Sequence, residues 1–352
     1  MQLPLLLCGP ILRRVAPNSV YIWVALSKRF TIDADLYRIK INEGEQTLDY
    51  HPIEHLTETN TIQLGEQLYI SLIKITPTTG NFPTQTLLGY NLIFKQDSLT
   101  FDLDHLGLLS PDSPHNIVYG TLKYPAFYIH DGSKPNILYG SCRKFHGKGL
   151  DSLTSGDLLL KDVYLRVDER PNSLFLLGDQ IYADDIAAPL FPIISILEKS
   201  LAGQQKNIAD IDPRLSLEPF QSSINQIHGR QFIMENFCGF TSNHAHNHLI
   251  RFEEYATTYL LSWSPELWHV VGQNHLLRTF EETVKQGEIY FVYPDEERFK
   301  EERKEEYLQH HNRYTEQIDH VRNSISTISN IRRLMANIPT YMMFDDHEIT
   351  DD

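Results

Sequence analysis

Apolar and polar residues alternate along the first 130 residues in the pattern that β-strands produce. Segments rich in β-branched and aromatic residues at 20–26, 30–39, 61–75 and 87–95 are separated by Gly, Pro, Asn and Asp. No helical spacing of apolar residues competes with this pattern. The spacing predicts a small all-β sandwich over residues 1–130, and because nothing there points to chemistry, we expect an accessory or docking domain.

The pattern changes near residue 135, where strands and helices begin to alternate. The apolar segment NILYGSC (136–142) precedes a helix-like spacing of leucines and valines over 151–168, and the apolar run SLFLLGDQ (173–180) follows. A strand, a helix and a strand in such short succession predict a βαβ unit, and hence a parallel sheet. The continuous run at 173–180 is typical of a strand that is buried on both faces.

The sequence of residues 190–310 predicts a mostly helical insert. The segment 190–203 favours one helix, and 252–268 favours another that ends near Pro265. The charge run at 294–306 favours a solvated helix.

A long amphipathic helix and a short strand follow the insert. Apolar residues recur at steps of three or four from Tyr314 to Met335, which predicts a helix that ends at Pro339. YMMF (341–344) then forms a short apolar segment, and DDHEITDD follows it. We therefore assign residues 131–352 to an α/β domain, the second of two domains.

The composition is that of a folded protein, since 41% of the 352 residues are hydrophobic and 22% are charged. The 31 basic and 46 acidic residues leave a net charge of −15, which would repel phosphate backbones and argues against a nucleic-acid-binding surface. No apolar stretch reaches the roughly 18 residues of a membrane-spanning helix, so we expect no membrane partner.

Three cysteines, Cys8, Cys142 and Cys238, lie far apart and form no CxxC motif. An odd number of separated cysteines fits a reducing compartment, and we expect a cytoplasmic protein. The apolar N-terminal run is short, lacks a basic region before it and is broken by Pro4 and Pro10. It therefore predicts a first β-strand rather than a signal sequence.

Each of the three apolar strands of the α/β domain ends in a cluster of polar residues. SCRK follows the first strand, DQIYADD the second and DDHE the third. In open α/β sheets ligands lie beyond the carboxyl ends of the strands, so clusters that are far apart in sequence are expected to converge in space. Crowded carboxylates repel each other unless a cation is bound, and the convergence therefore predicts a metal centre.

The residue types in these clusters suit hard metal ions. Carboxylates such as Asp179 favour Ca²⁺ and Fe³⁺, and a Cys142 thiolate with a Tyr182 phenolate would suit ferric iron. His347 stands beside Asp346, where it would bind a phosphate oxygen or donate a proton.

The same segments carry a resemblance to a known family. GDQIYADD resembles the G-D-x-x-[DY] metal motif of calcineurin-like metallophosphatases, and DDHE resembles the variant Asn-His motif of alkaline phosphatase D-like (PhoD-like) enzymes. SCRK is similar to the segment whose cysteine replaces the usual Asp-x-His in that family. GFTS (239–242), YLLSWSPELW (259–268) and the opening GPILRRV also resemble its cytoplasmic bacterial members, so the resemblance touches nearly the whole chain.

The resemblance implies a four-layer αββα domain, with metal ions at the strand ends, that hydrolyses phosphate mono- or diesters. By position, Asp179 would bridge two metal sites, and Cys142 and Tyr182 would bind Fe³⁺. Asp346 would bind the second metal, a divalent ion such as Ca²⁺.

The resemblance also implies two catalytic residues. His347 would contact the phosphate or assist the leaving group, and Arg143 would neutralise developing charge. Family members continue past the DDHEITDD segment and place further histidine ligands there. We therefore expect this chain to hold only the N-terminal part of the catalytic domain, and to be poorly stable and weakly active or inactive.

Each of these residues also has a purely structural interpretation. Cys142 could be an inert core thiol, Tyr182 could pack on the sheet, and Asp184 and Asp185 could cap the next helix. The terminal Asp351–Asp352 pair is expected to fray.

Two groups of histidines lie outside these clusters. The three histidines of HAHNH (244–248) could form a metal clip on one side of a strand, but a polar loop is the favoured interpretation. His310 and His311 fall on the long helix, where we expect them to be solvated. For the whole chain, the alternatives to a hydrolase are a non-catalytic metal- or partner-binding module and an inactive, truncated remnant of the enzyme.

Overall fold

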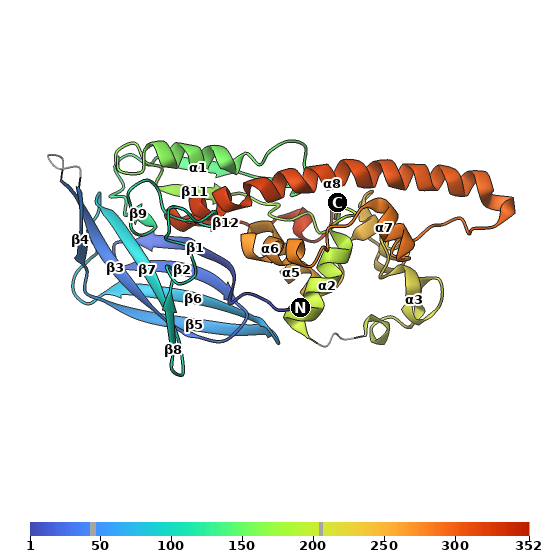
Figure 1. Ribbon diagram of the computed structural model, residues 1–352, viewed down its shortest axis with the longest axis horizontal. Helices are drawn as coiled ribbons and strands as arrows, with labels where there is room; N and C mark the ends of the chain where they lie inside the picture. Colours follow the sequence, from blue (N-terminus) through green and yellow to red (C-terminus); the bar gives the residue numbers. More distant parts are fainter. Residues whose placement is uncertain (43–46, 204–206, 352) are drawn as a thin grey trace.

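Two antiparallel sheets form the N-terminal part of the computed structural model, which describes residues 1–42, 47–203 and 207–351. The strands are β1 Leu6–Ala16, β2 Ser19–Leu26, β3 Thr31–Asn42, β4 Thr47–Pro52, β5 His55–Gly65, β6 Leu68–Pro77, β7 Leu87–Gln96, β8 Leu99–Asp102 and β9 Ala126–Tyr128. One sheet has the order β1-β2-β6-β5 and the other β4-β3-β7-β8, with β9 also paired to β7 (Figure 1).

Alternating apolar residues fill the space between these sheets. In β2, Val20, Ile22 and Val24 are fully buried, because every second side chain of a strand points to the same face. In the other sheet Phe94 stacks on Phe101, with 5.1 Å between the ring centroids. These residues belong to one hydrophobic cluster, which is the core of the N-terminal part.

The segment 61–75, which the sequence pattern treats as one strand, is divided between β5 and β6. The two strands pair antiparallel and turn between Gly65 and Leu68. The turn is fixed from outside, since the Gln67 amide donates to the Leu201 carbonyl at 2.8 Å. A contact with a helix far along the chain thus sets this turn.

A parallel sheet forms the centre of the second part. Its strands are β10 Ile137–Gly140, β11 Ser173–Leu176 and β12 Thr340–Met342, in that order. Helix α1, Leu153–Asp162, connects β10 to β11, and both strand pairs are parallel, as the strand–helix–strand pattern predicts.

Only one face of this sheet is well covered. Leu174 and Leu176 of β11 are buried, whereas Phe175 on the other face stacks on Tyr341 at 5.0 Å and Tyr139 is 78% exposed. The prediction that β11 is buried on both faces is therefore wrong. Within 131–203 and 207–351 the named strands form this single sheet, and the second sheet of an αββα arrangement is not among them.

Helices occupy most of the insert, as its sequence predicts. The longer ones are α2 Phe191–Ala202, α5 Phe252–Trp263, α6 Pro265–Gln273, α7 Phe280–Lys285 and α8 Lys300–Asn337, and the short α3 Phe220–Ser223 and α4 Gln231–Ile233 lie between α2 and α5. Pro265 separates α5 from α6 because it starts the second helix, which the Ser264 hydroxyl caps by accepting from the Leu267 amide at 3.0 Å.

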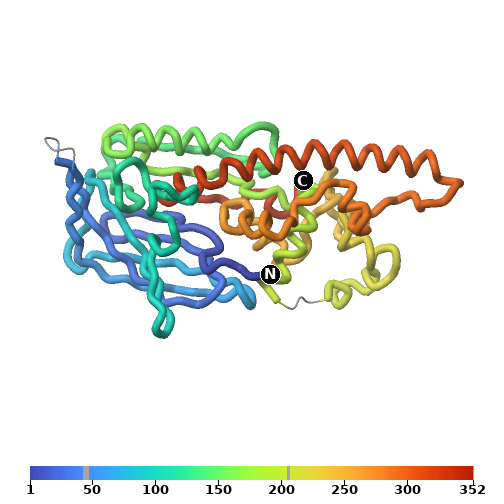
Figure 2. The backbone as a smooth tube through the Cα atoms, viewed as in Figure 1, coloured from blue at the N-terminus to red at the C-terminus, as the bar shows by residue number. Residues whose placement is uncertain are grey.

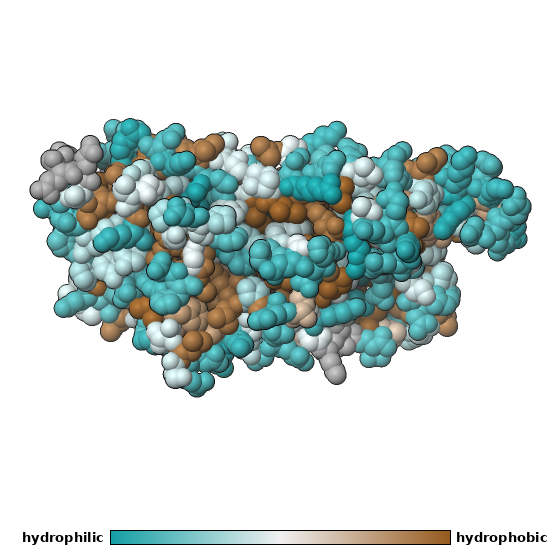
Figure 3. Space-filling view, viewed as in Figure 1, coloured by the Kyte–Doolittle hydropathy of each residue, from teal (hydrophilic) through white to brown (hydrophobic). Residues whose placement is uncertain are grey.

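The long helix α8 runs along one side of the molecule and projects beyond the rest of the insert (Figures 1 and 2). Hydrophilic side chains cover its projecting end, where the charge run lies (Figure 3). None of the helices in the part of the chain that the structure describes is both long and apolar enough to cross a membrane.

The end of α8 is bonded directly to the N-terminal part. The Asn337 side chain accepts from the Ala126 amide at 2.6 Å and donates to the Ile117 carbonyl at 2.7 Å. The buried hydroxyl of Tyr90 donates to the Ala336 carbonyl at 2.8 Å. The two parts also share a hydrophobic cluster, in which Leu7 of β1 joins residues of β11 and α8.

Candidate metal centre at the strand ends

The carboxyl ends of β10, β11 and β12 lie together, so the three polar clusters of the sequence converge. The Cys142 amide donates to the Gly178 carbonyl at 3.1 Å, and the Arg143 amide donates to the Asp179 carbonyl at 2.9 Å. The Ala183 amide donates to the His347 carbonyl at 2.8 Å. Backbone hydrogen bonds therefore join loops that are far apart in sequence.

A buried carboxylate, Glu348, holds two of these loops in place. Its oxygens accept from the backbone amides of Asp179 (3.1 Å), Gln180 (2.6 Å) and Asp345 (2.9 Å), and from the Tyr259 hydroxyl (3.0 Å). Glu348 is not among the site residues predicted from the sequence. The signal for it is a capping box, since an acid follows Asp345 by three residues at the start of the turn Asp346–Glu348.

The backbone around the centre is tightly constrained. Gly178 has a φ of +121°, and a Cβ at this position would overlap the Asp345 carboxylate. Asp179 and Cys142 have φ values of +50° and +59°, a left-handed conformation that costs about 1–3 kcal/mol for a residue with a side chain. Such conformations are concentrated at functional sites, where the surrounding structure enforces them.

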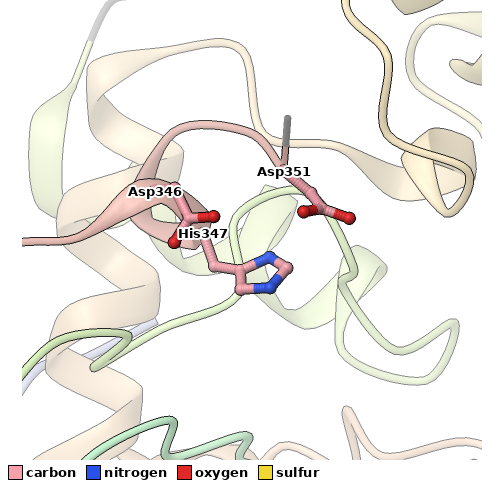
Figure 4. A group of neighbouring side chains, drawn as sticks. All are labelled: Asp346, His347 and Asp351. Carbon is pink, nitrogen blue, oxygen red and sulfur yellow. The ribbon is translucent and has the colours of Figure 1, made fainter.

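Two groups of donor atoms are close enough to hold a metal ion. One donor atom each of Asp179, Asp345 and Asp346 lie within 4.8 Å of one another, and so do those of Asp346, His347 and Asp351 (Figure 4). Asp346 belongs to both groups, whereas the family resemblance implies that Asp179 bridges the two sites. Asp345 and Asp351, which are not among the ligands predicted from the sequence, complete the two groups.

The donor set fits a hard cation. Asp179 is 3% exposed, and its Oδ1 atom is buried without a hydrogen-bond partner. An isolated buried carboxylate oxygen is costly, and here it lies among further carboxylates that repel it. A bound cation would satisfy this oxygen and relieve the repulsion.

Cys142 and Tyr182 lie next to each other beside Asp179. Cys142 is exposed, so its interpretation as an inert core thiol is wrong. Burial raises the pKa of Tyr182 well above its ordinary value, and the neighbouring Cys142 and Asp179 raise it further. Tyr182 would therefore become a phenolate only if a strong cation were bound to it.

His347 is oriented by a buried carboxylate. Its Nδ1 atom lies 3.0 Å from an oxygen of Asp184, and its ring lies 4.3 Å from that of Tyr182. Partial burial opposes protonation, but the hydrogen bond and charge of Asp184, with the charges of Asp179 and Asp346, raise the pKa of His347. These neighbours therefore stabilise the protonated ring relative to an isolated histidine.

The acids that follow Tyr182 do not cap the next helix. Asp184 accepts from the Ser242 hydroxyl and from the Asp351 amide, both at 3.1 Å, and Asp185 pairs with Lys144. Leu190 occupies the N-cap position of α2 and makes no side-chain cap. The capping interpretation of Asp184 and Asp185 is therefore wrong.

The C-terminal segment is tied down at Asp351. Its amide donates to Asp184, and its carbonyl accepts from the Thr241 hydroxyl at 3.2 Å, so the expectation that Asp351 frays is wrong. Asp352 lies outside the described residues.

Arg143 has partners outside the acidic cluster at the strand ends. Its guanidinium donates to Asp151 at 2.6 Å and to the Ser262 carbonyl at 2.8 Å, and it lies 4.1 Å from the centroid of the Trp263 ring. In this arrangement Arg143 joins β10 to α5 and does not share in the acidic cluster. The cation next to Tyr182 is Lys144, whose ammonium group lies 5.4 Å from the centre of the Tyr182 ring.

A crevice of about 330 Å³ opens beside these loops. Its lining includes Cys142, Lys144, Lys148 and Ser152, so it reaches from the strand ends to the N-terminus of α1. Two lysines and a helix N-terminus make this the part of the centre that best suits an anion.

Comparisons with known proteins assign no family. No protein-family model and no curated protein matches the chain. Among solved structures, a cyclomaltodextrinase is similar over 49% of this chain and 31% of its own, at 9% identity and a TM-score of 0.19. An amylomaltase from Corynebacterium glutamicum is similar over 96% of this chain and 45% of its own, at 10% identity and a TM-score of 0.15. The chain thus spans less than half of either protein, and similarities this slight carry no argument about fold or function.

Proposed function

We propose that this chain is the metal-binding part of a phosphoric ester hydrolase of the PhoD-like type, acting on phosphate mono- or diesters. In this proposal an N-terminal β-sandwich precedes a calcineurin-like α/β domain. The observation that carries it is the orphaned Oδ1 atom of Asp179, a residue whose carboxylate lies beside those of Asp345 and Asp346 where three strand ends meet.

Two kinds of donor would hold two kinds of ion. Cys142 and Tyr182, with Asp179, provide the thiolate, phenolate and carboxylate that ferric iron prefers, and Asp346 provides oxygen for a divalent ion such as Ca²⁺. When bound, the ions would supply positive charge that polarises the phosphate ester. The chain's own task is to hold these donors, which Glu348 performs through its hydrogen bonds to the Asp179 and Asp345 amides.

His347 would act on the substrate itself. Its Nδ1 atom is engaged by Asp184, which leaves Nε2 for a phosphate oxygen or for the leaving group. The hydrogen bond and charge of Asp184 raise the pKa of His347, which favours the protonated form that this contact needs. Arg143 would neutralise charge only after release from Asp151, and Lys144 only after release from Asp185. We therefore assign the anion contact to the exposed Lys148 of the crevice.

The second candidate is a non-catalytic module that binds a metal ion. It is favoured by the composition of the two donor groups, in which five different residues contribute four carboxylates and one imidazole. Such a set suits a structural Ca²⁺ ion as well as a catalytic centre. The two candidates differ in their metal content and in their dependence on chelators.

Metal analysis and a phosphodiesterase assay of the same preparation test the proposal. We expect iron with a divalent ion, hydrolysis that a chelator abolishes, and a visible absorption band that Tyr182→Phe removes. Asp179→Asn should lose both metal and activity, while Asp112→Asn, at an exposed position of the N-terminal part, should retain them. Calcium alone would favour the module, and a metal-loaded chain without hydrolysis would refute the enzyme.

In this proposal the protein binds a phosphate ester as its substrate and binds neither nucleic acid nor a membrane. We place the protein in the cytoplasm. The three free cysteines, of which Cys142 and Cys238 are exposed, support a reducing compartment.

A further inference from the structure

Three histidines from separate segments form a second cluster, distinct from the strand-end centre. His228 lies in the loop after α3, His246 in the turn Ala245–Asn247, and His310 on α8. The ring of His228 lies 4.1 Å from that of His310 and 5.7 Å from that of His246, measured between centroids. The segment 244–248 is a loop, as its sequence predicts, with a short turn at Ala245–Asn247. His246 and His310 are partly buried, so the expectation of a solvated His310 is wrong.

The backbone that carries two of these histidines is held firmly. The His228 amide donates to the Asn247 side chain at 2.8 Å, and the Arg230 amide donates to the His246 carbonyl at 3.1 Å. The Arg230 side chain is fully buried and pairs with Glu254 at 2.6 Å. The positions of His228 and His246 are therefore set by the fold and not by contacts between their rings.

Two ring nitrogens of the cluster are buried without a partner. They are Nε2 of His228, a residue that is 8% exposed, and Nδ1 of His310. Polar atoms buried in this way are rare, because each costs the hydrogen bond that it would make in water. Burial lowers the pKa of His228 and brings the pKa values of His246 and His310 to about 4. All three rings are thus neutral at pH 7, the form that ligates metals.

A cavity of about 510 Å³ borders all three rings. Glu235 and Glu306 are its charged lining residues, so the cavity itself favours a cation. Arg303 and Arg313 lie near the rings and oppose a cation. Glu306 at 3.9 Å from Arg303 and Asp185 at 3.6 Å from Arg313 offset their charges. The cavity leaves space for the imidazoles to turn about their side-chain bonds.

We propose that His228, His246 and His310 form a binding site for a divalent transition-metal ion such as Zn²⁺. Imidazole ligands select Zn²⁺, Ni²⁺ or Cu²⁺ over the hard ions that suit the carboxylates at the strand ends. The three nitrogens do not yet converge within 4.8 Å, as the donors of the two acidic groups do, so binding requires the rings to rotate toward the cavity. A bound ion would join α8 to the insert.

Calorimetric titration with Zn²⁺ tests this site in the full chain, in an Asp179→Asn, Asp346→Asn background that disables the strand-end centre. We expect one Zn²⁺ per chain and a rise in melting temperature on binding. His228→Gln, His246→Gln and His310→Gln should each weaken binding at least tenfold. His311→Gln is the matched control, because His311 neighbours His310 on α8 but contacts Phe280 and Glu281 instead.

The result does not depend on the proposed hydrolase, because the background removes that centre and no activity is measured. Circular dichroism identifies any variant that fails to fold. His246, which is only partly buried in its short turn, provides an independent variant if His228→Gln unfolds. Absence of Zn²⁺ binding by the folded background protein would overturn the proposal. Equal affinity of the His310→Gln and His311→Gln variants would overturn it as well.

Discussion

Replacement of Glu348 by glutamine should destabilise the strand-end loops. Each carboxylate oxygen accepts two hydrogen bonds: one from Gln180 and Tyr259, the other from Asp179 and Asp345. Either orientation of the glutamine amide therefore loses two bonds and faces their donors with an NH₂ group.

The expected cost follows from those two bonds. A hydrogen bond to a charged group contributes about 1.5–3 kcal/mol net, so Glu348→Gln should lower the free energy of unfolding by about 3–6 kcal/mol. A typical domain has only about 5–15 kcal/mol in total, and the variant should therefore unfold at a clearly lower denaturant concentration.

Urea denaturation in the presence of a chelator measures this effect without a contribution from bound metal. Glu305→Gln is the matched control, since Glu305 is exposed on α8 and should change stability by less than about 0.5 kcal/mol. Tyr259→Phe removes one of the four bonds and should give a smaller loss than Glu348→Gln. If Glu348→Gln lies within 1 kcal/mol of the wild type, Glu348 does not hold the loops as we infer.

Three further changes test other parts of the structure. Gly178→Ala should displace the Asp345 carboxylate and abolish metal binding. Gly149 also has a positive φ but open space around it, so Gly149→Ala should cost only the backbone strain of about 1–3 kcal/mol. Equal metal affinity of the two variants would contradict this. Although burial opposes it, Arg230 lowers the pKa of Glu254 from 4.5 to about 2. The ion pair should therefore stabilise the fold above pH 4.5, and about 3 kcal/mol of that stability should be lost as the pH falls toward 2. Glu254→Gln should remove this pH dependence of urea denaturation, and an unchanged profile would argue against the assignment. Asp184→Asn should lower the pKa of His347 in the metal-free chain, as followed by NMR titration, and an unchanged titration would exclude Asp184 as the cause.

The strand ends could be located from sequence because local signals mark them. An apolar run that stops at small and acidic residues defines both the strand and its carboxyl end, and parallel pairing then brings Cys142, Asp179 and Asp346 to one edge of the sheet. The coverage of the sheet was not predictable in this way. An apolar strand such as β11 has the same pattern whether one or both of its faces are packed.

The roles of residues whose partners are distant in sequence could not be predicted. Glu348 accepts from amides 168 and 169 residues earlier, and a backbone donor leaves no mark on the sequence. Arg143 was expected at the carboxylates, but Ser262 in the insert provides a carbonyl 119 residues away that holds it elsewhere. The cluster around His228 likewise depends on how three segments pack, and no spacing along the chain indicates it.

The hydrogen bonds of Asn337 connect the N-terminal part of the chain to the placement of the metal ligands. Asn337 ends α8 and is bonded to Ala126 and Ile117, only three residues before the start of β12. The direction in which β12 leaves the helix, and with it the placement of Asp346 and His347, is thereby set by residues that precede the parallel sheet in the chain. A fragment consisting of residues 131–352 would lack these two contacts, so we expect it to hold the metal ligands less firmly than the full chain does.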